Sequence, residues 1–183
     1  MSSEEKRLSE QEQLDAARGR FISEIAKNIH LYDLPPSIGR LYGTVFFSKD
    51  PMTLDDMSEE MGMSKTSMST GIRSLVEADM VERVWEKGVR KDLYKTEDDW
   101  YKSFSTVFIK RWRNATETNL EAIGETEEML NRLKERADHD EVIYAVNIDL
   151  EKLHRARKYY EWLNEVIALF ETGEIFEIVP KKE

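Results

Sequence analysis

Residues 53–97 read TLDDMSEEMGMSKTSMSTGIRSLVEADMVERVWEKGVRKDLYKTE, and this stretch decides the fold. Thr53 and Asp56 have the spacing of a capping box, which predicts that a short helix starts here. Gly62 can supply the left-handed turn between two helices, and Met63, which follows it, is expected to insert into the core. Ser64 then caps a second helix that runs to about Ala78. The order predicts a pair of helices joined by a tight turn, the helix-turn-helix motif.

Two short strands are predicted after the second helix, over residues 81–85 and 92–96. In the first strand, Val81, Arg83 and Trp85 share one face, as they would in a half-buried strand. Residues 86–91 connect the strands with Gly88 at the tip. A helical hairpin that is followed by a β-hairpin is the order of elements in a winged helix-turn-helix.

Helices are predicted on both sides of this module. Apolar residues at helical spacing predict a first helix over 8–30, which the Pro35-Pro36 pair stops, and Ser37 is a candidate cap for a second. Thr96 and Asp99 form another capping-box pattern, predicting a long helix from Trp100. A last helix is expected over about 149–172.

These elements predict a mainly α fold with a small β-hairpin wing. We divide the chain into an N-terminal helix (1–36), a winged helix-turn-helix module (37–99), and a long helix with C-terminal helices (100–183). The first and third parts are expected to contribute to dimerisation. Residues 153–170 carry apolar side chains at alternating spacings of three and four, which indicates a helix seam. That seam could pair two subunits or pack inside one, and we expect it to pair two subunits.

The composition argues against several classes of protein. The chain has no cysteine and three scattered histidines, so thiol catalysis and a metal site are not expected. No phosphate loop or catalytic triad is present, and we expect neither an enzyme nor a cofactor. The N-terminus lacks the apolar core of a signal peptide, and no apolar run is long enough to span a membrane. A cytoplasmic protein is expected.

Charge is unevenly distributed along the chain. The net charge is −10, which by itself disfavours nucleic acid as a partner. Residues 64–91, however, hold six basic and four acidic side chains, a local charge of +2. A local basic surface on an acidic protein permits binding to DNA at that surface alone.

The second helix of the hairpin has the chemistry to read double-stranded DNA. Short polar and basic side chains crowd its first two turns, where a helix in the major groove meets base edges and phosphates. The basic loop would reach neighbouring phosphates or the minor groove. The predicted DNA-binding residues are Ser64, Lys65, Thr66, Ser67, Ser69, Thr70, Arg73, Lys87, Arg90 and Lys91.

One alternative is a winged-helix module that binds protein, with the terminal helices as an assembly scaffold. Serine-rich helix starts and turn glycines are common, and the acidic total charge is compatible with this alternative. The ordered combination of capped helix, glycine turn, polar helix, strand, basic loop and strand favours DNA.

Residues 53–97 resemble the winged-helix regulators related to MarR, and more narrowly the GbsR-type branch. The IGRLYG segment at 38–43 and the aromatic helix from Trp100 are also similar to that branch. The resemblance implies a dimeric repressor of genes for osmoprotectant uptake or synthesis. It further implies a palindromic operator and an effector such as choline or glycine betaine.

A quaternary ammonium effector requires aromatic rings, because it is held by their negative faces. The resemblance implies such a cage between the DNA-binding module and the dimerisation helices. Asp98 or Asp99 could add a negative charge, or could simply cap a helix. Aromatic residues at helical spacing are also common in cores, and Phe104 and Phe108 are expected there. The predicted effector residues are Tyr42, Tyr94, Trp100 and Tyr101.

Overall fold

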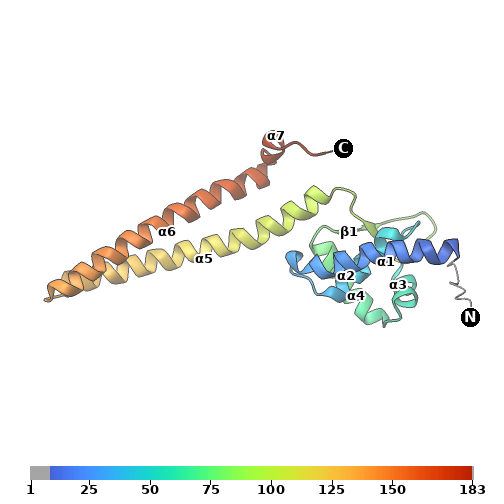
Figure 1. Cartoon of the computed structure of the whole chain (residues 1–183), viewed down its shortest axis with the longest axis horizontal. Coiled ribbons are helices and arrows are strands. Elements are labelled where there is room, and N and C mark those ends of the chain that lie inside the picture. The colour runs from blue at the N-terminus through green and yellow to red at the C-terminus, as the bar shows by residue number, and fades with distance from the viewer. Residues whose placement is uncertain (1–8, 183) are drawn as a thin grey trace, which may run out of the picture. The chain divides into compact units, whose positions relative to one another are not determined.

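The computed structural model describes residues 9–182 and contains two compact units (Figure 1). The first ends at Phe104 and the second begins at Ser105. Mainly helical structure with one small antiparallel β-hairpin confirms the predicted fold class. The elements of the first unit are α1 (Glu10–Asn28), η1 (Ile29–Tyr32), α2 (Pro36–Phe47), α3 (Leu54–Met61), α4 (Lys65–Glu77), β1 (Val81–Val84), β2 (Leu93–Thr96) and the first turn of α5 (Trp100–Arg136).

Local signals set most of the helix ends as predicted. As predicted, Thr53 caps α3 through a complete capping box and Ser64 caps α4 by accepting from the amide of Ser67. Ser9 caps α1 through a second capping box, which was not predicted. Gly62 takes φ +61° between α3 and α4, the left-handed turn that the sequence predicts. The first helix was expected from residue 8, but that residue lies outside the described part of the chain.

Two predicted caps are wrong. Helix α2 starts at Pro36, whose missing N–H costs nothing at the first helical position, so Ser37 lies inside the helix. Helix α5 is capped by Asp99, which accepts from the amides of Tyr101 at 3.0 Å and Lys102 at 3.2 Å. Thr96 is instead the last residue of β2, because its backbone pairs with Val81.

Helix α2 lies at the centre of the first unit. Leu41 and Val45 are buried with Met57 of α3 and Leu75 of α4. A side-chain carbon on Gly39 would lie 2.6 Å from the Cα of Ala26, so α1 and α2 approach each other closely at this glycine. This packing leaves the opposite face of α4 toward solvent.

The wing is the hairpin formed by β1, β2 and the loop of residues 85–92. Its strands are antiparallel, with Val81 opposite Thr96 and Val84 opposite Leu93. Met52 adds a two-bond bridge to the outer side of β2 at Tyr94. The wing therefore has its base anchored to the chain segment that precedes α3.

The second unit is a helical hairpin of α5 and α6 (Asp140–Thr172), which lie side by side in Figure 1, followed by α7 (Ile175–Ile178). Helix α6 begins nine residues before the predicted start. Leu163 and Ile167 of the predicted seam are buried, and the ring of Phe170 lies 4.6 Å from that of Phe108. The seam therefore packs against α5 within one chain.

Three apolar side chains expected to be buried or half-buried are exposed. Met63 is 37% exposed, Phe104 is 47% exposed and Trp85, just beyond the end of β1, is 78% exposed. The first follows the Gly62 turn, which directs it away from the core. No helix within residues 9–182 has the length and apolarity needed to cross a membrane.

Candidate nucleic-acid interface

Helix α4 presents the polar face that the sequence predicts. Met68, Ile72 and Leu75 are buried on one side. Ser69 is half-buried at the edge between the two sides. The exposed side carries six of the predicted contact residues, namely Ser64, Lys65, Thr66, Ser67, Thr70 and Arg73.

The start of α4 is joined to the wing through one carboxylate. Asp55 of α3 places one oxygen 2.7 Å from the Nζ of Lys65 and the other 2.7 Å from the Nζ of Lys91. Hydrogen bonds from Lys65 and then Lys91 lower the pKa of Asp55 to about 2. Asp55 was not among the predicted site residues, since nothing in the local pattern distinguishes it from an ordinary acidic residue in the first turn of a helix.

Three basic side chains without a partner among the described residues lie on α4 and on the wing. Within residues 9–182, Arg73, Lys87 and Arg90 have no ion pair or side-chain hydrogen bond, and all three are exposed. Gly88 takes φ +91° at the tip, which lets the loop turn between Lys87 and Arg90. Lys65 and Lys91 pair with Asp55, so these three are the predicted basic contact residues that have no carboxylate partner in the described part of the chain.

A small cavity lies behind α4, where the α4–β1 turn meets the first turn of α5. Its volume is about 70 Å³, several times the roughly 10–15 Å³ that one water needs. Burial raises the pKa of Tyr42 to about 12, with a smaller contribution from Tyr32. The lining residues include Ile25, Ile29, Tyr32, Tyr42, Met80, Trp100 and Ser103.

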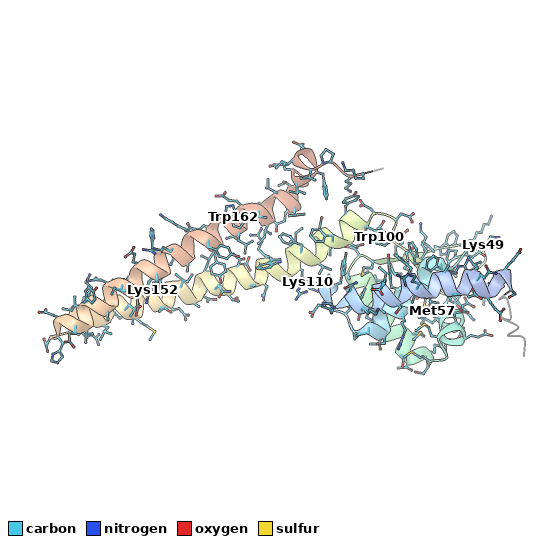
Figure 2. The ribbon with its side chains drawn as sticks, in the orientation of Figure 1. Lys49, Met57, Trp100, Lys110, Lys152 and Trp162 are labelled. Carbon is cyan, nitrogen blue, oxygen red and sulfur yellow. The ribbon has the colours of Figure 1, made fainter. Side chains whose placement is uncertain are left out.

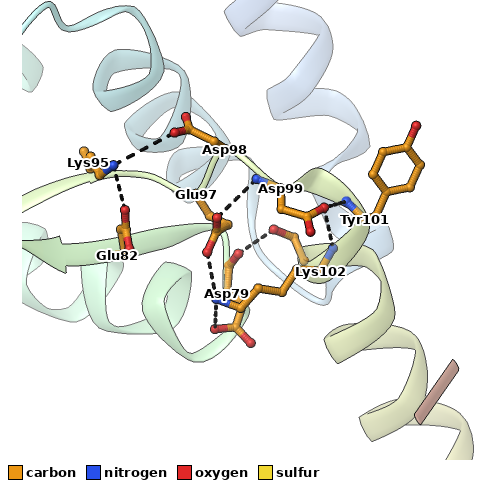
Figure 3. Close-up of polar contacts among 9 residues, drawn as sticks. Asp79, Glu82, Lys95, Glu97, Asp98, Asp99, Tyr101 and Lys102 are labelled. Carbon is orange, nitrogen blue, oxygen red and sulfur yellow. Dashed lines mark hydrogen bonds and ion pairs between the residues drawn. The ribbon is translucent and has the colours of Figure 1, made fainter. Parts of the chain in front are cut away.

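The cavity contains two of the four predicted effector residues. Tyr42 is 3% exposed and its ring centroid lies 6.3 Å from that of Trp100, in an edge-to-face arrangement. Tyr94 and Tyr101 do not line it. Tyr94 lies on β2 in the wing, and the ring of Tyr101, in the first turn of α5, points away from the other residues labelled in Figure 3. Tyr32, which the sequence analysis missed, is the third aromatic residue of the lining.

A polar network next to this cavity joins the end of α4 to the start of α5 (Figure 3). The Ser103 hydroxyl donates to the backbone carbonyl of Asp79, a residue held at φ +50° in the turn after α4. Lys102 lies 2.7 Å from Glu97 and 3.6 Å from the Asp79 carboxylate. Ser103 thus contacts both the cavity and the turn that ends α4.

The helix-turn-helix, the exposed polar face of α4 and the basic wing together define a winged helix-turn-helix protein. A crystal structure of a transcriptional regulator shares this fold, with a TM-score of 0.50 at 15% identity over 83% of this chain and 93% of that one.

The amino-acid sequence is similar to those of one family of transcriptional regulators. Residues 100–177 match the family described as "GbsR family transcriptional regulator, C-terminal helical hairpin". The HTH-type transcriptional regulator YvaV of Bacillus subtilis (strain 168) is 39% identical over 92% of this chain and 95% of its own length. The HTH-type transcriptional repressor GbsR of the same organism is 36% identical over 91% of this chain and 93% of its own.

The chain belongs to the GbsR family of transcriptional regulators. This confirms the resemblance seen in residues 53–97. The relatives are regulators and not enzymes, as expected. Their names as transcriptional regulators also favour regulation over the alternative of a protein-assembly scaffold.

Proposed function

We propose that this regulator is a repressor that binds a palindromic operator in double-stranded DNA as a homodimer. The observation that carries the proposal is the exposed face of α4, joined through Asp55 to a wing with free cations. In this arrangement α4 enters the major groove and reads base edges, while Lys87 and Arg90 contact phosphates. The regulated genes would be those for choline or glycine betaine uptake or synthesis, by analogy with the GbsR-type branch.

Binding to DNA is tested with a duplex that carries the gene's own upstream region. Phosphate contacts release counterions, so affinity should fall steeply with added salt, with a log–log slope of about −0.9 for each phosphate contacted. Arg73→Ala and Arg90→Ala should each weaken binding, and Arg90→Ala should reduce the slope by about one. Absence of a shift at low salt would remove the repressor proposal.

The dimer would use a second face of α6, because the seam is already occupied by α5. Tyr144, Ile148, Tyr159 and Trp162 recur at spacings of 4, 11 and 3, which places them on one side of the helix. Tyr144 is 69% exposed and Trp162 (labelled in Figure 2) is 55% exposed. Exposed apolar side chains on one side of a helix, here interrupted by the Glu151–Arg155 ion pair, favour a partner helix. These four residues define the stripe. Trp162→Glu should give a monomer in sedimentation, whereas His154→Glu, at an exposed position outside the stripe, should leave the dimer intact.

The effector site that we propose is the cavity behind α4. The aromatic rings that would hold a quaternary ammonium group are those of Tyr32, Tyr42 and Trp100. Tyr32 replaces Tyr94 and Tyr101 of the predicted set. The Ser103–Asp79 contact would pass a change at the cavity to the end of α4. Altered spacing of two α4 helices, which must fit half-sites about one helical turn apart, would then change operator affinity.

Thermal shift tests the effector proposal. Choline, glycine betaine or carnitine at 100 times its dissociation constant should stabilise the protein by about 2.7 kcal/mol. Tyr32→Leu should abolish the shift, and Tyr94→Leu, outside the cavity, should leave it unchanged. A protein that none of the three compounds stabilises would contradict the cage.

A further inference from the structure

The wing carries one tryptophan, Trp85, that is not packed in the hydrophobic core. Trp85 is 78% exposed, the largest exposed fraction among the large apolar side chains of residues 9–182. An indole exposed to this extent leaves most of its apolar surface in water, where burial by a partner would be favourable. No packing role within the first unit accounts for a tryptophan at this position.

Trp85 lines a groove on the wing with a volume of about 590 Å³. Val84 and Val89 give the groove apolar walls, and Arg83, Arg90 and Lys91 give it positive charge. Arg83 pairs with Asp92 and Lys91 pairs with Asp55, which leaves Arg90 without an ion pair among the described residues. The groove therefore suits a ligand that has both an apolar surface and a negative charge.

We propose that this groove takes the sugar–phosphate backbone of duplex DNA, with the indole of Trp85 packed on a deoxyribose and Arg90 paired with the adjoining phosphate. The inference rests on the proposed DNA-binding function and adds a contact that carries no charge. A sugar–phosphate backbone combines the two properties that the groove requires.

The position of the groove favours DNA over an acidic peptide. Lys91 lines the groove and shares the Asp55 carboxylate with Lys65, at the start of α4. A duplex held by α4 would therefore lie beside the wing, and its backbone would pass the groove. A peptide would gain nothing from this proximity to α4.

The test compares Trp85→Ala, Trp85→Phe and Lys87→Ala in the full chain, using the upstream duplex at several salt concentrations. Trp85→Ala should weaken binding about five- to tenfold, from the apolar surface no longer buried. Its salt slope should equal that of the original protein, because no charge is removed. Trp85→Phe should retain most of the affinity. Lys87→Ala should lower the slope by about one.

Iodide quenching of tryptophan fluorescence gives a second readout. The emission that Trp85→Phe removes should be shielded from iodide when the duplex is added. Unchanged affinity for Trp85→Ala, with a normal thermal melt, would overturn the inference while leaving the repressor proposal intact. Shielding by an acidic peptide but not by the duplex would overturn it in favour of a protein partner. Failure of the unmodified protein to bind DNA would remove both proposals.

Discussion

Asp55 lies 2.7 Å from Lys91 across 36 positions of sequence, and this contact ties the wing to the helical hairpin. Its second oxygen holds Lys65 at the same distance. Two lysines predicted to contact DNA therefore share one carboxylate in the free protein, and the three side chains together keep a charge of +1. The arrangement restrains the wing and also competes with phosphate for both cations.

The titration of Asp55 should report this contact directly. Its pKa is about 2, compared with 3.8 for an ordinary aspartate. The stability from the contact is thus present above about pH 3.8 and is lost as the pH falls toward 2. Lys91→Ala should raise the pKa of Asp55 without restoring it fully, since Lys65 remains. Carboxyl NMR measures the shift, and an unchanged pKa in this variant would contradict the shared bridge.

Asp55→Asn should strengthen the response of DNA binding to salt. Loss of the carboxylate frees Lys65 and Lys91 for phosphate, so the log–log slope should steepen by about one to two. Affinity at low salt should rise as well. Glu77→Gln, an exposed charge change at the far end of α4, is the matched control and should have a much smaller effect. A shallower slope for Asp55→Asn would mean that the contact serves to orient the wing.

The sequence predicts the module because its signals are local. Thr53, Gly62 and Ser64 act on backbone groups within three or four residues, so their spacing alone identifies two helices and a turn. Asp55 acts across 36 residues, and Tyr32 reaches the cavity only because η1 folds the chain toward α2. Such contacts depend on tertiary packing, which spacing does not reveal.

The seam of α6 was recognisable as a seam, but its partner was not. Alternating spacings of three and four indicate that a neighbouring helix covers the seam. They do not show whether that helix belongs to the same chain or to a second subunit. Leu163 and Ile167 pack within the α5–α6 hairpin, where Arg113 also binds Glu171 and Asn164. Helix α5 of the same chain therefore covers the seam, which a second subunit could otherwise have contacted.

Ser103→Ala should destabilise the first unit by about 1 kcal/mol, because its hydroxyl is a partner of the Asp79 carbonyl. Chemical denaturation measures the change. Lys102→Met removes an ion pair whose lysine is exposed and whose glutamate is half-buried, and should change the free energy of unfolding by about 0.5 kcal/mol. If both substitutions lowered the free energy of unfolding equally, the hydrogen bond of Ser103 would contribute no more to stability than the ion pair of Lys102.

Two glycines should respond in opposite directions to alanine. A Cβ on Gly39 would lie 2.6 Å from the Cα of Ala26, so Gly39→Ala should destabilise the protein by about 1–3 kcal/mol. Gly19 lies in α1 with open space around it, and Gly19→Ala should stabilise by about 1 kcal/mol through helix propensity. Thermal melts of both variants check the pair. A neutral Gly39→Ala would show that α1 and α2 can separate at little cost.

Thr116→Val should stabilise the α5–α6 hairpin. Thr116 is fully buried, and its hydroxyl oxygen has no hydrogen-bond partner among the described residues. A buried hydroxyl without a partner carries a desolvation penalty, so replacing it by a methyl group of similar shape should add about 1 kcal/mol to the free energy of unfolding. Thr118→Val is the matched control: that hydroxyl is exposed and bonded to the carbonyl of Asn114 at 3.0 Å, so no gain is expected. Calorimetry of both variants separates the cases, because a general preference for valine in α5 would raise both melting temperatures, whereas the buried hydroxyl affects only Thr116→Val.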